Sequence, residues 1–179
     1  MATDNWYRNT TWDSDIEADF ETRLKRSKGT FYKAQYLRIQ SFHLLDSPDV
    51  KVQLVGIEQM ERLISEFPTE EFSVILGQEE LGNYYLKTDN FEKAAEYFKI
   101  VVDYCENKKS RRGTSAKADL KLAEVILTAN WVNKLNEAYH ICKNYPIIEL
   151  AFNNDKFYYA ELAAHICDKL NKSEEAKEF

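Results

Sequence analysis

Apolar residues recur three and four positions apart through most of this chain, in stretches separated by short polar turns. This spacing places apolar side chains on one face of an α-helix, whereas a half-buried strand would show strict alternation. Only 5 glycines and 3 prolines occur among 179 residues, too few for the many tight turns of a β-sandwich or barrel. The sequence therefore predicts an all-α protein built from successive amphipathic helices.

Capping and breaking residues indicate where these helices begin and end. Ser14 opens an S-x-x-E capping box, and Gly29 follows that helix as a stop. Ser47 is the expected N-cap of a later helix, with Pro48 at its first position. Residues 147–152 are left open, either as a buried connection or as the start of a helix. The predicted helices cover approximately residues 15–28, 30–45, 48–67, 70–87, 91–106, 115–131, 136–145, 154–170 and a short segment at 174–179.

The length of the chain is sufficient to bury a core without disulfides or metals. We expect a single compact unit, in which residues 1–29 form an aromatic N-terminal segment and capping helix and residues 30–179 form the main helical domain. Trp6, Tyr7 and Trp12 are expected to fold back over the open hydrophobic edge of the first helices. The alternative is that these three residues belong to a binding surface, where Trp and Tyr are over-represented.

Charge and cysteine usage disfavour several classes of protein. Thirty acidic residues against 24 Lys and Arg give a net charge of -6 and a pI near 5.2, so general nucleic-acid binding is not expected. The N-terminal residues do not resemble a signal peptide, and no apolar run is long enough to span a membrane. The three cysteines lack metal-type spacing, which fits buried thiols in a reducing compartment. We expect a cytoplasmic protein without a membrane span.

The sequence contains no common catalytic motif, such as G-x-S-x-G, a Walker loop or HExxH. The tripeptide HIC occurs twice, pairing His140 with Cys142 and His165 with Cys167. Residues two apart on a helix point in nearly opposite directions, so neither pair chelates a metal by itself. A site built across both helices is the remaining metal alternative. We expect a protein with no catalytic residue, no metal site and no cofactor.

One stretch follows a known repeat closely. Leu81, Gly82, Tyr85, Ala94 and Phe98 occur in the order and at the spacing that the tetratricopeptide repeat family shows over its two helices. The stretch resembles one unit of that family. The resemblance implies that the small residue at position 82 lets two helices approach closely, while Tyr85 fills the space beside them.

Three further helix pairs resemble the repeat less closely. Their matching residues are Gly56, Met60, Leu63 and Pro68; Ala123, Ile126 and Ala138; and Leu162, Ala163, Ile166 and Ala176. The residues at the small-residue position are Leu44, a poor match, and Gly82, Ala123 and Ala163, which lie 38, 41 and 40 residues apart rather than the roughly 34 of the family. The resemblance implies stacked antiparallel helical hairpins, with about four irregular pairs preceded by a capping helix. A generic α-helical repeat or bundle is the alternative.

The resemblance also implies a concave face, lined by the first helix of each pair, that holds a peptide or a protein edge. Glu79 stands where chaperone-binding members of the family have lysine, so a clamp for a C-terminal carboxylate is not expected. A solvated helix face is the alternative for every lining position. The corresponding residues of this chain are Arg38, Ser41, Glu79, Asn83, Lys87, Lys117, Lys121, Glu124, Tyr158, Glu161 and His165.

Three functions from different classes remain open. The leading hypothesis is a non-catalytic adaptor or scaffold that binds a protein or peptide on the concave face. The chain also resembles bacterial immunity proteins, which are small, acidic and helical and neutralise a toxin by stoichiometric binding. The third is an RNA-associated role through the basic linker 108–121. The partner and the oligomeric state are left open. The basic residues of the linker are Lys108, Lys109, Arg111, Arg112, Lys117 and Lys121.

Overall fold

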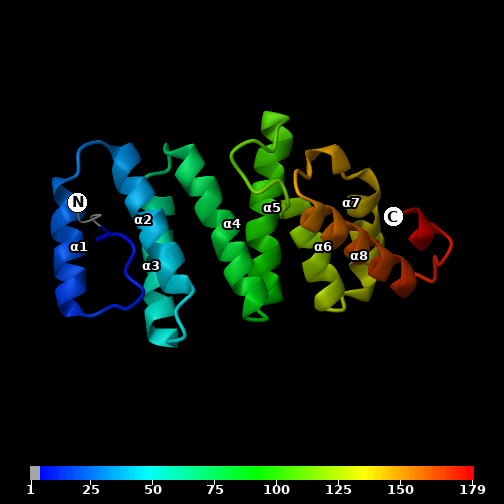
Figure 1. Cartoon of the computed structure of the whole chain (residues 1–179), viewed down its shortest axis with the longest axis horizontal. Coiled ribbons are helices and arrows are strands. Elements are labelled where there is room, and N and C mark those ends of the chain that lie inside the picture. Colours follow the sequence, from blue (N-terminus) through cyan, green and yellow to red (C-terminus); the bar gives the residue numbers. More distant parts are fainter. Residues whose placement is uncertain (1–4) are drawn as a thin grey trace. The chain divides into compact units, whose positions relative to one another are not determined.

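The computed structural model describes residues 5–179, apart from the side chain of Glu178, and this part is helical and contains no strand (Figure 1). Within it, no helix is both long and apolar enough to cross a membrane. The all-α prediction is confirmed. The helices are α1 (Ser14–Arg26), α2 (Thr30–Leu45), α3 (Val50–Glu66), α4 (Glu71–Lys87), α5 (Phe91–Lys108), α6 (Ala118–Thr128), α7 (Leu135–Asn144) and α8 (Asn153–Lys169), with 3-10 turns η1 (Val132–Lys134), η2 (Ile147–Glu149) and η3 (Glu175–Glu178).

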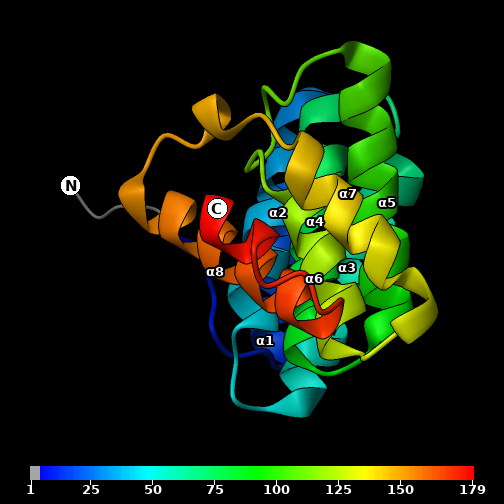
Figure 2. The same ribbon diagram turned by 90° about the vertical axis from the view of Figure 1, so that its right-hand side faces the viewer.

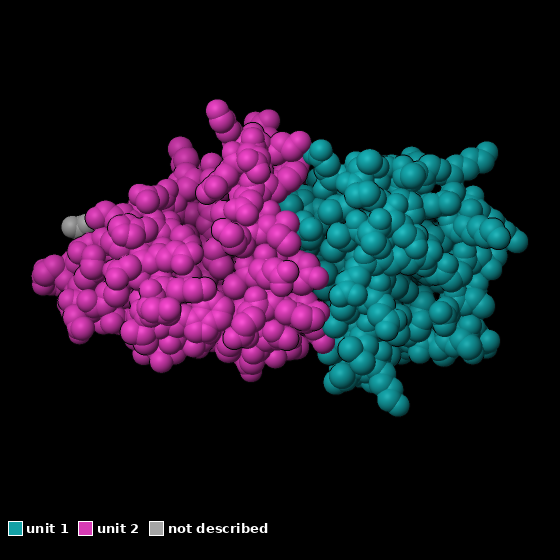
Figure 3. Space-filling model, turned by 180° about the vertical axis from the view of Figure 1, so that it is seen from behind, with its two compact units in different colours: residues 1–81 teal, residues 82–179 magenta. Residues whose placement is uncertain are grey.

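The chain divides into two compact units, residues 1–81 and residues 82–179 (Figure 3). The division falls inside α4, so its first part belongs to unit 1 and its last turns belong to unit 2. The expectation from the sequence was a single compact unit in which residues 1–29 form an N-terminal segment and capping helix. Residues 1–4 of that N-terminal segment lie outside the described part.

Unit 1 is built around the antiparallel pair α2 and α3, which lie side by side (Figure 1). Leu37, Leu44 and Met60 are fully buried in its core. Gly56 on α3 faces α2 so closely that an added Cβ would lie 3.0 Å from the backbone nitrogen of Leu45 and 3.1 Å from the Cβ of Leu44. Glycine is therefore what allows the two helices to pack at this distance.

The N-terminal segment packs against α1 and α2 of the same unit. The ring of Trp6 lies 5.3 Å from Phe20 and 4.8 Å from Tyr36, measured between centroids. The backbone N–H of Asn9 donates to Gln40 Oε1 at 3.0 Å, and Gln40 Nε2 donates back to the Asn9 carbonyl at 2.8 Å. These contacts support the interpretation that the segment covers the first helices.

Unit 2 begins with the last turns of α4 and the whole of α5. An added Cβ on Gly82 would lie 2.8 Å from the ring of Phe98, and Ala94 and Phe98 are fully buried. Tyr85 stacks on Tyr97, with centroids 5.7 Å apart and planes at 9°. The close helix approach that the repeat resemblance implies at position 82 is therefore present.

The remaining helices of unit 2 pack consecutively, α5 on α6, α6 on α7 and α7 on α8. Figure 2 shows α6, α7 and α8 gathered together in this unit. All three cysteines are buried thiols that form no disulfide, as expected from the sequence. The core that these helices share is made by Leu120, Ala123, Ile126, Ala138, Cys142, Tyr159, Leu162, Ala163, Ile166 and Cys167, among others.

Two predicted helix caps are wrong by a short shift along the chain. The N-cap of α1 is Asp13 rather than Ser14, because its carboxylate accepts the first-turn N–H groups at 3.0 and 2.9 Å. The N-cap of α3 is Asp49 rather than Ser47, with a bond of 2.9 Å. In both places a carboxylate stands beside the predicted hydroxyl, and it also complements the positive end of the helix dipole.

The second half of the chain is less helical than predicted. Helix α6 begins at Ala118 rather than near 115, because Ala116 takes a left-handed conformation with φ of 63°. Residues 147–152 form the short turn η2 and an extended connection. The final helix predicted at 174–179 is the 3-10 turn η3.

Candidate functional site

Polar and aromatic side chains of α6, of α8 and of the residue before α6 form two bonded groups in unit 2, one of three residues and one of two, and we call them together the α6–α8 face. Lys121 pairs with Glu124 at 2.7 Å. The Tyr158 hydroxyl donates to the same Glu124 carboxylate at 2.5 Å, and the Lys121 ammonium lies 4.7 Å from the Tyr158 ring centroid. Lys117, the residue before α6, binds Asp155 of α8 at 2.8 Å.

The helical period explains why these residues share one side. Lys117, Lys121 and Glu124 are four and three residues apart, so they follow one stripe of α6 while Leu120 and Ala123 turn into the core. Burial, together with the Glu124 hydrogen bond, raises the pKa of Tyr158. Its hydroxyl therefore keeps the proton that it donates. Each of the two groups is held in place by its own bonds.

Two further predicted residues continue this stripe on α8. Glu161 and His165 follow Tyr158 at spacings of three and four, and both are exposed. Asp155 is a member that the sequence analysis missed. The sequence shows that Asp155 lies three residues before Tyr158, on the same side of the helix. Its pairing with Lys117 depends on how α6 and α8 pack, and a single sequence does not reveal that packing.

The predicted lining residues of unit 1 are arranged differently from the expectation. Arg38 is committed to Glu80, with a bond of 2.7 Å between two side chains that are each 17% exposed. Burial raises the pKa of Glu80 to about 7, although Arg38 opposes the shift. Glu79 is only 4% exposed and Ser41 is fully buried, so neither lines an open surface. Glu80 is not among the residues predicted to line the concave face.

The other predicted residues are accessible to different degrees. Asn83 and Lys87 are exposed on the last turns of α4, in unit 2. Tyr7 and Trp12 are half-buried in unit 1, and the ring of Trp12 lies 5.5 Å from Phe20. The predicted set is thus divided between the two units, and the α6–α8 face contains its best-connected part.

Three of the six basic residues of the linker, Arg111, Lys117 and Lys121, are paired with neighbouring carboxylates. Arg111 Nε donates to Asp119 at 3.1 Å, and its Nη1 lies 3.4 Å from Glu149. Lys117 and Lys121 are ion-paired within the α6–α8 face. Compensated charge attracts a phosphate backbone weakly, so these contacts do not favour the RNA hypothesis.

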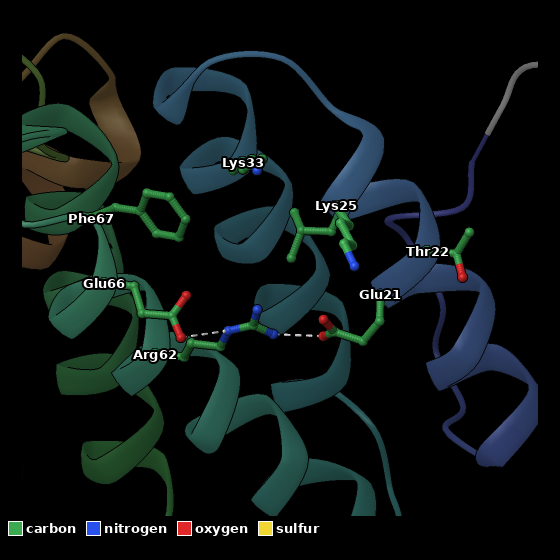
Figure 4. Close-up of a pocket in the computed structure, with 8 residues that line it drawn as sticks. Glu21, Thr22, Lys25, Lys33, Arg62, Glu66 and Phe67 are labelled. Carbon is green, nitrogen blue, oxygen red and sulfur yellow. Dashed lines mark hydrogen bonds and ion pairs between the residues drawn. The ribbon is translucent and has the colours of Figure 1, made fainter.

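A cavity of about 380 Å³ in unit 1 is lined mainly by charged groups (Figure 4). Arg62 points between two carboxylates and binds Glu21 at 2.6 Å and Glu66 at 3.1 Å. Lys25 and Lys33 complete its charged lining. The lining also includes Thr22 but no serine, cysteine or histidine, so these residues do not form a Ser–His or Cys–His pair.

The two HIC tripeptides place their residues on opposite sides of their helices. His140 and His165 are exposed, whereas Cys142 and Cys167 are buried. Burial raises the pKa of Cys142 to about 12, so its thiol stays protonated near neutral pH. Among the described residues, no group of three His, Cys, Asp or Glu lies close enough to hold a metal ion.

Comparison of the chain with models of known protein families, with curated proteins and with solved structures found no match. The helical architecture is compatible with a helical-repeat family.

Proposed function

We propose that this chain is a non-catalytic protein-interaction module of tetratricopeptide-like architecture, acting in the cytoplasm as an adaptor or scaffold. The observation that carries the proposal is the α6–α8 face, in which Lys121, Glu124 and Tyr158 hold one another in place. The face offers a partner both charges and an aromatic ring, with exposed Glu161 and His165 beside it.

The order of this face favours binding. A side chain that is already fixed loses little rotamer entropy when a partner arrives, which is a large cost at flexible surfaces. Tyrosine is also over-represented among the residues that contribute most to binding energy. The partner that fits best is a peptide or protein edge that bears both acidic and basic groups.

The contacts at Gly56 and Gly82 support the tetratricopeptide-like part of the proposal. At each glycine, two consecutive helices lie so close together that an added Cβ would be 3.0 Å or less from an atom of the neighbouring helix. The small positions of the repeat require such a close approach. Helix α2 packs on α3 in unit 1, and α5, α6, α7 and α8 pack consecutively in unit 2, which is the arrangement of stacked hairpins.

The test is site-specific photo-crosslinking in the cells that make the protein. A photoreactive phenylalanine analogue replaces Glu161 or His165 on the face and, as a matched control, the exposed Glu96 on α5. We expect one partner to be crosslinked from positions 161 and 165 but not from 96. Equal crosslinking from all three positions would contradict the proposal.

The affinity of the purified partner then identifies the kind of module. Tyr158→Phe and Lys121→Ala should each weaken binding severalfold, because each removes one contact that orders the face. A micromolar Kd is typical of a peptide-binding adaptor, whereas a sub-nanomolar one-to-one complex would make the chain an inhibitor of the immunity type. Unchanged affinity in both variants would remove the α6–α8 face from the proposal.

A further inference from the structure

A second concave surface of unit 2 lies among α5, α6 and α7, and we call it the α5–α7 groove. Its volume is about 550 Å³, within the roughly 300–1,000 Å³ of ordinary ligand sites. Val102 of α5, Leu122 of α6 and Ile141 of α7 line its apolar floor. Glu106 of α5 and Glu137 of α7 belong to its rim.

The floor is apolar surface that the packing of the unit leaves partly uncovered. Val102, Leu122 and Ile141 are each only half-buried, while Leu120 and Ile126 of α6 are fully in the core. Three apolar side chains from three helices thus converge on one hollow. Contiguous apolar surface bordered by polar groups is typical of an interaction site.

The rim gives the groove a negative charge. Glu106 and Glu137 are exposed, and neither is held in an ion pair within the described part of the chain. Asp119 also borders the groove, but Arg111 neutralises it. The two carboxylates that remain face a partner without compensation, on a chain whose net charge is -6.

We propose that the α5–α7 groove binds a cationic amphipathic segment of a partner protein. A large apolar side chain of that segment lies over Leu122, and lysine or arginine side chains beside it pair with Glu106 and Glu137. An amphipathic helix in a hydrophobic groove is a common mode of peptide recognition, and opposite charge at the rim sets its specificity.

This groove is independent of the α6–α8 face. On a helical period, Asp119 and Leu122 fall on roughly the opposite side of α6 from Lys121 and Glu124. The two surfaces differ in character as well, because the α6–α8 face is ion-paired and polar whereas the groove has an apolar floor. A partner can therefore occupy either surface while the other stays free.

The probe is a short fluorescein-labelled helical peptide of leucine and lysine, with leucines at helical spacing, and its control carries glutamate in place of lysine. Fluorescence anisotropy should show saturable one-to-one binding of the lysine peptide alone. The double variant Glu106→Gln/Glu137→Gln should bind about tenfold more weakly, because two exposed charge pairs are lost. Glu92→Gln/Glu96→Gln, which removes two exposed carboxylates elsewhere on α5, should leave the Kd unchanged.

Amide chemical shifts of the ¹⁵N-labelled protein locate the peptide. We expect changes at Val102, Leu122 and Ile141, and no effect of Lys121→Ala on the Kd. Changes centred on Lys121 and Tyr158 would overturn the groove proposal and assign the peptide to the α6–α8 face. Equal binding of both peptides, an unchanged Kd in the rim double variant, or no binding of the lysine peptide would also overturn it.

Discussion

Alanine at position 82 tests the contact on which the helical hairpin of unit 2 depends. The new Cβ would lie 2.8 Å from Cε1 and 2.9 Å from Cδ1 of Phe98, closer than carbon atoms pack without strain. The Phe98 ring is fully buried, so it can move only by displacing its other neighbours. One methyl group is therefore enough to disturb the packing of α5 against these last turns of α4.

Two effects of opposite sign determine the magnitude. Alanine favours a helix interior over glycine by about 1 kcal/mol. Overpacking a close-packed core costs about 1–3 kcal/mol, and three ring atoms of one buried aromatic place Gly82 toward the upper end of that range. We expect Gly82→Ala to lower the free energy of unfolding by about 1–2 kcal/mol, net of the gain in helix propensity.

Gly77→Ala is the matched control on the same helix. Its new Cβ would meet the Met60 sulfur at 2.7 Å, but a methionine side chain has three rotatable bonds and adapts its shape readily. The gain in helix propensity then offsets most of the steric cost, so we expect Gly77→Ala to leave the free energy of unfolding nearly unchanged. Urea unfolding followed by circular dichroism should give a midpoint for Gly82→Ala about 0.5–1 M below that of Gly77→Ala. A Gly82→Ala midpoint equal to or above that of the control would refute this reasoning.

Three further perturbations have defined outcomes. The pKa of Glu80 is about 7 in the fold and 4.5 in the unfolded chain, so its ionisation destabilises the fold as the pH rises from 4.5 to 7. Urea unfolding should show that the free energy of unfolding of the native chain falls by roughly 3 kcal/mol relative to that of Glu80→Gln across this pH range. A difference between the two chains that does not change with pH would contradict this. Asn90→Ala removes the side-chain cap of α5, whose bond is 3.3 Å, and should cost about 1 kcal/mol in the same assay, whereas an unchanged midpoint would show that the cap adds nothing. Tyr158→Phe deletes the bond to Glu124 and should lower the free energy of unfolding by about 1–2 kcal/mol in the same urea assay; unaltered stability would contradict this prediction.

The helices were predictable because their period and breaks are local properties of the sequence. The close approach at Gly82 was also predictable, since the spacing of Ala94 and Phe98 after it follows one recognisable helix pair. The ends of helices were harder to predict where two possible capping residues are neighbours, as Asp13 and Ser14 are. The left-handed residue Ala116 has no signal in sequence, because alanine strongly favours helix.

Site prediction failed where a shift of one position changes the side of a helix. Glu79 was chosen for the surface, but it is buried, and its neighbour Glu80 binds Arg38. Consecutive residues on a helix differ in direction by about 100°, so a small error in register exchanges an exposed carboxylate for a buried one. Contacts between helices, such as that of Lys117 with Asp155, depend on tertiary packing and cannot be inferred from a single sequence.

The contacts of the N-terminal segment also determine what happens when the chain is truncated at its N-terminus. Gln40 is fully buried and exchanges its hydrogen bonds with Asn9, so a chain shortened to Ser14 would keep a buried amide without these partners. It would also uncover Phe20, the aromatic residue against which Trp6 and Trp12 pack. An uncovered apolar edge promotes self-association, and a shortened chain would therefore form aggregates under conditions in which the full chain stays dispersed.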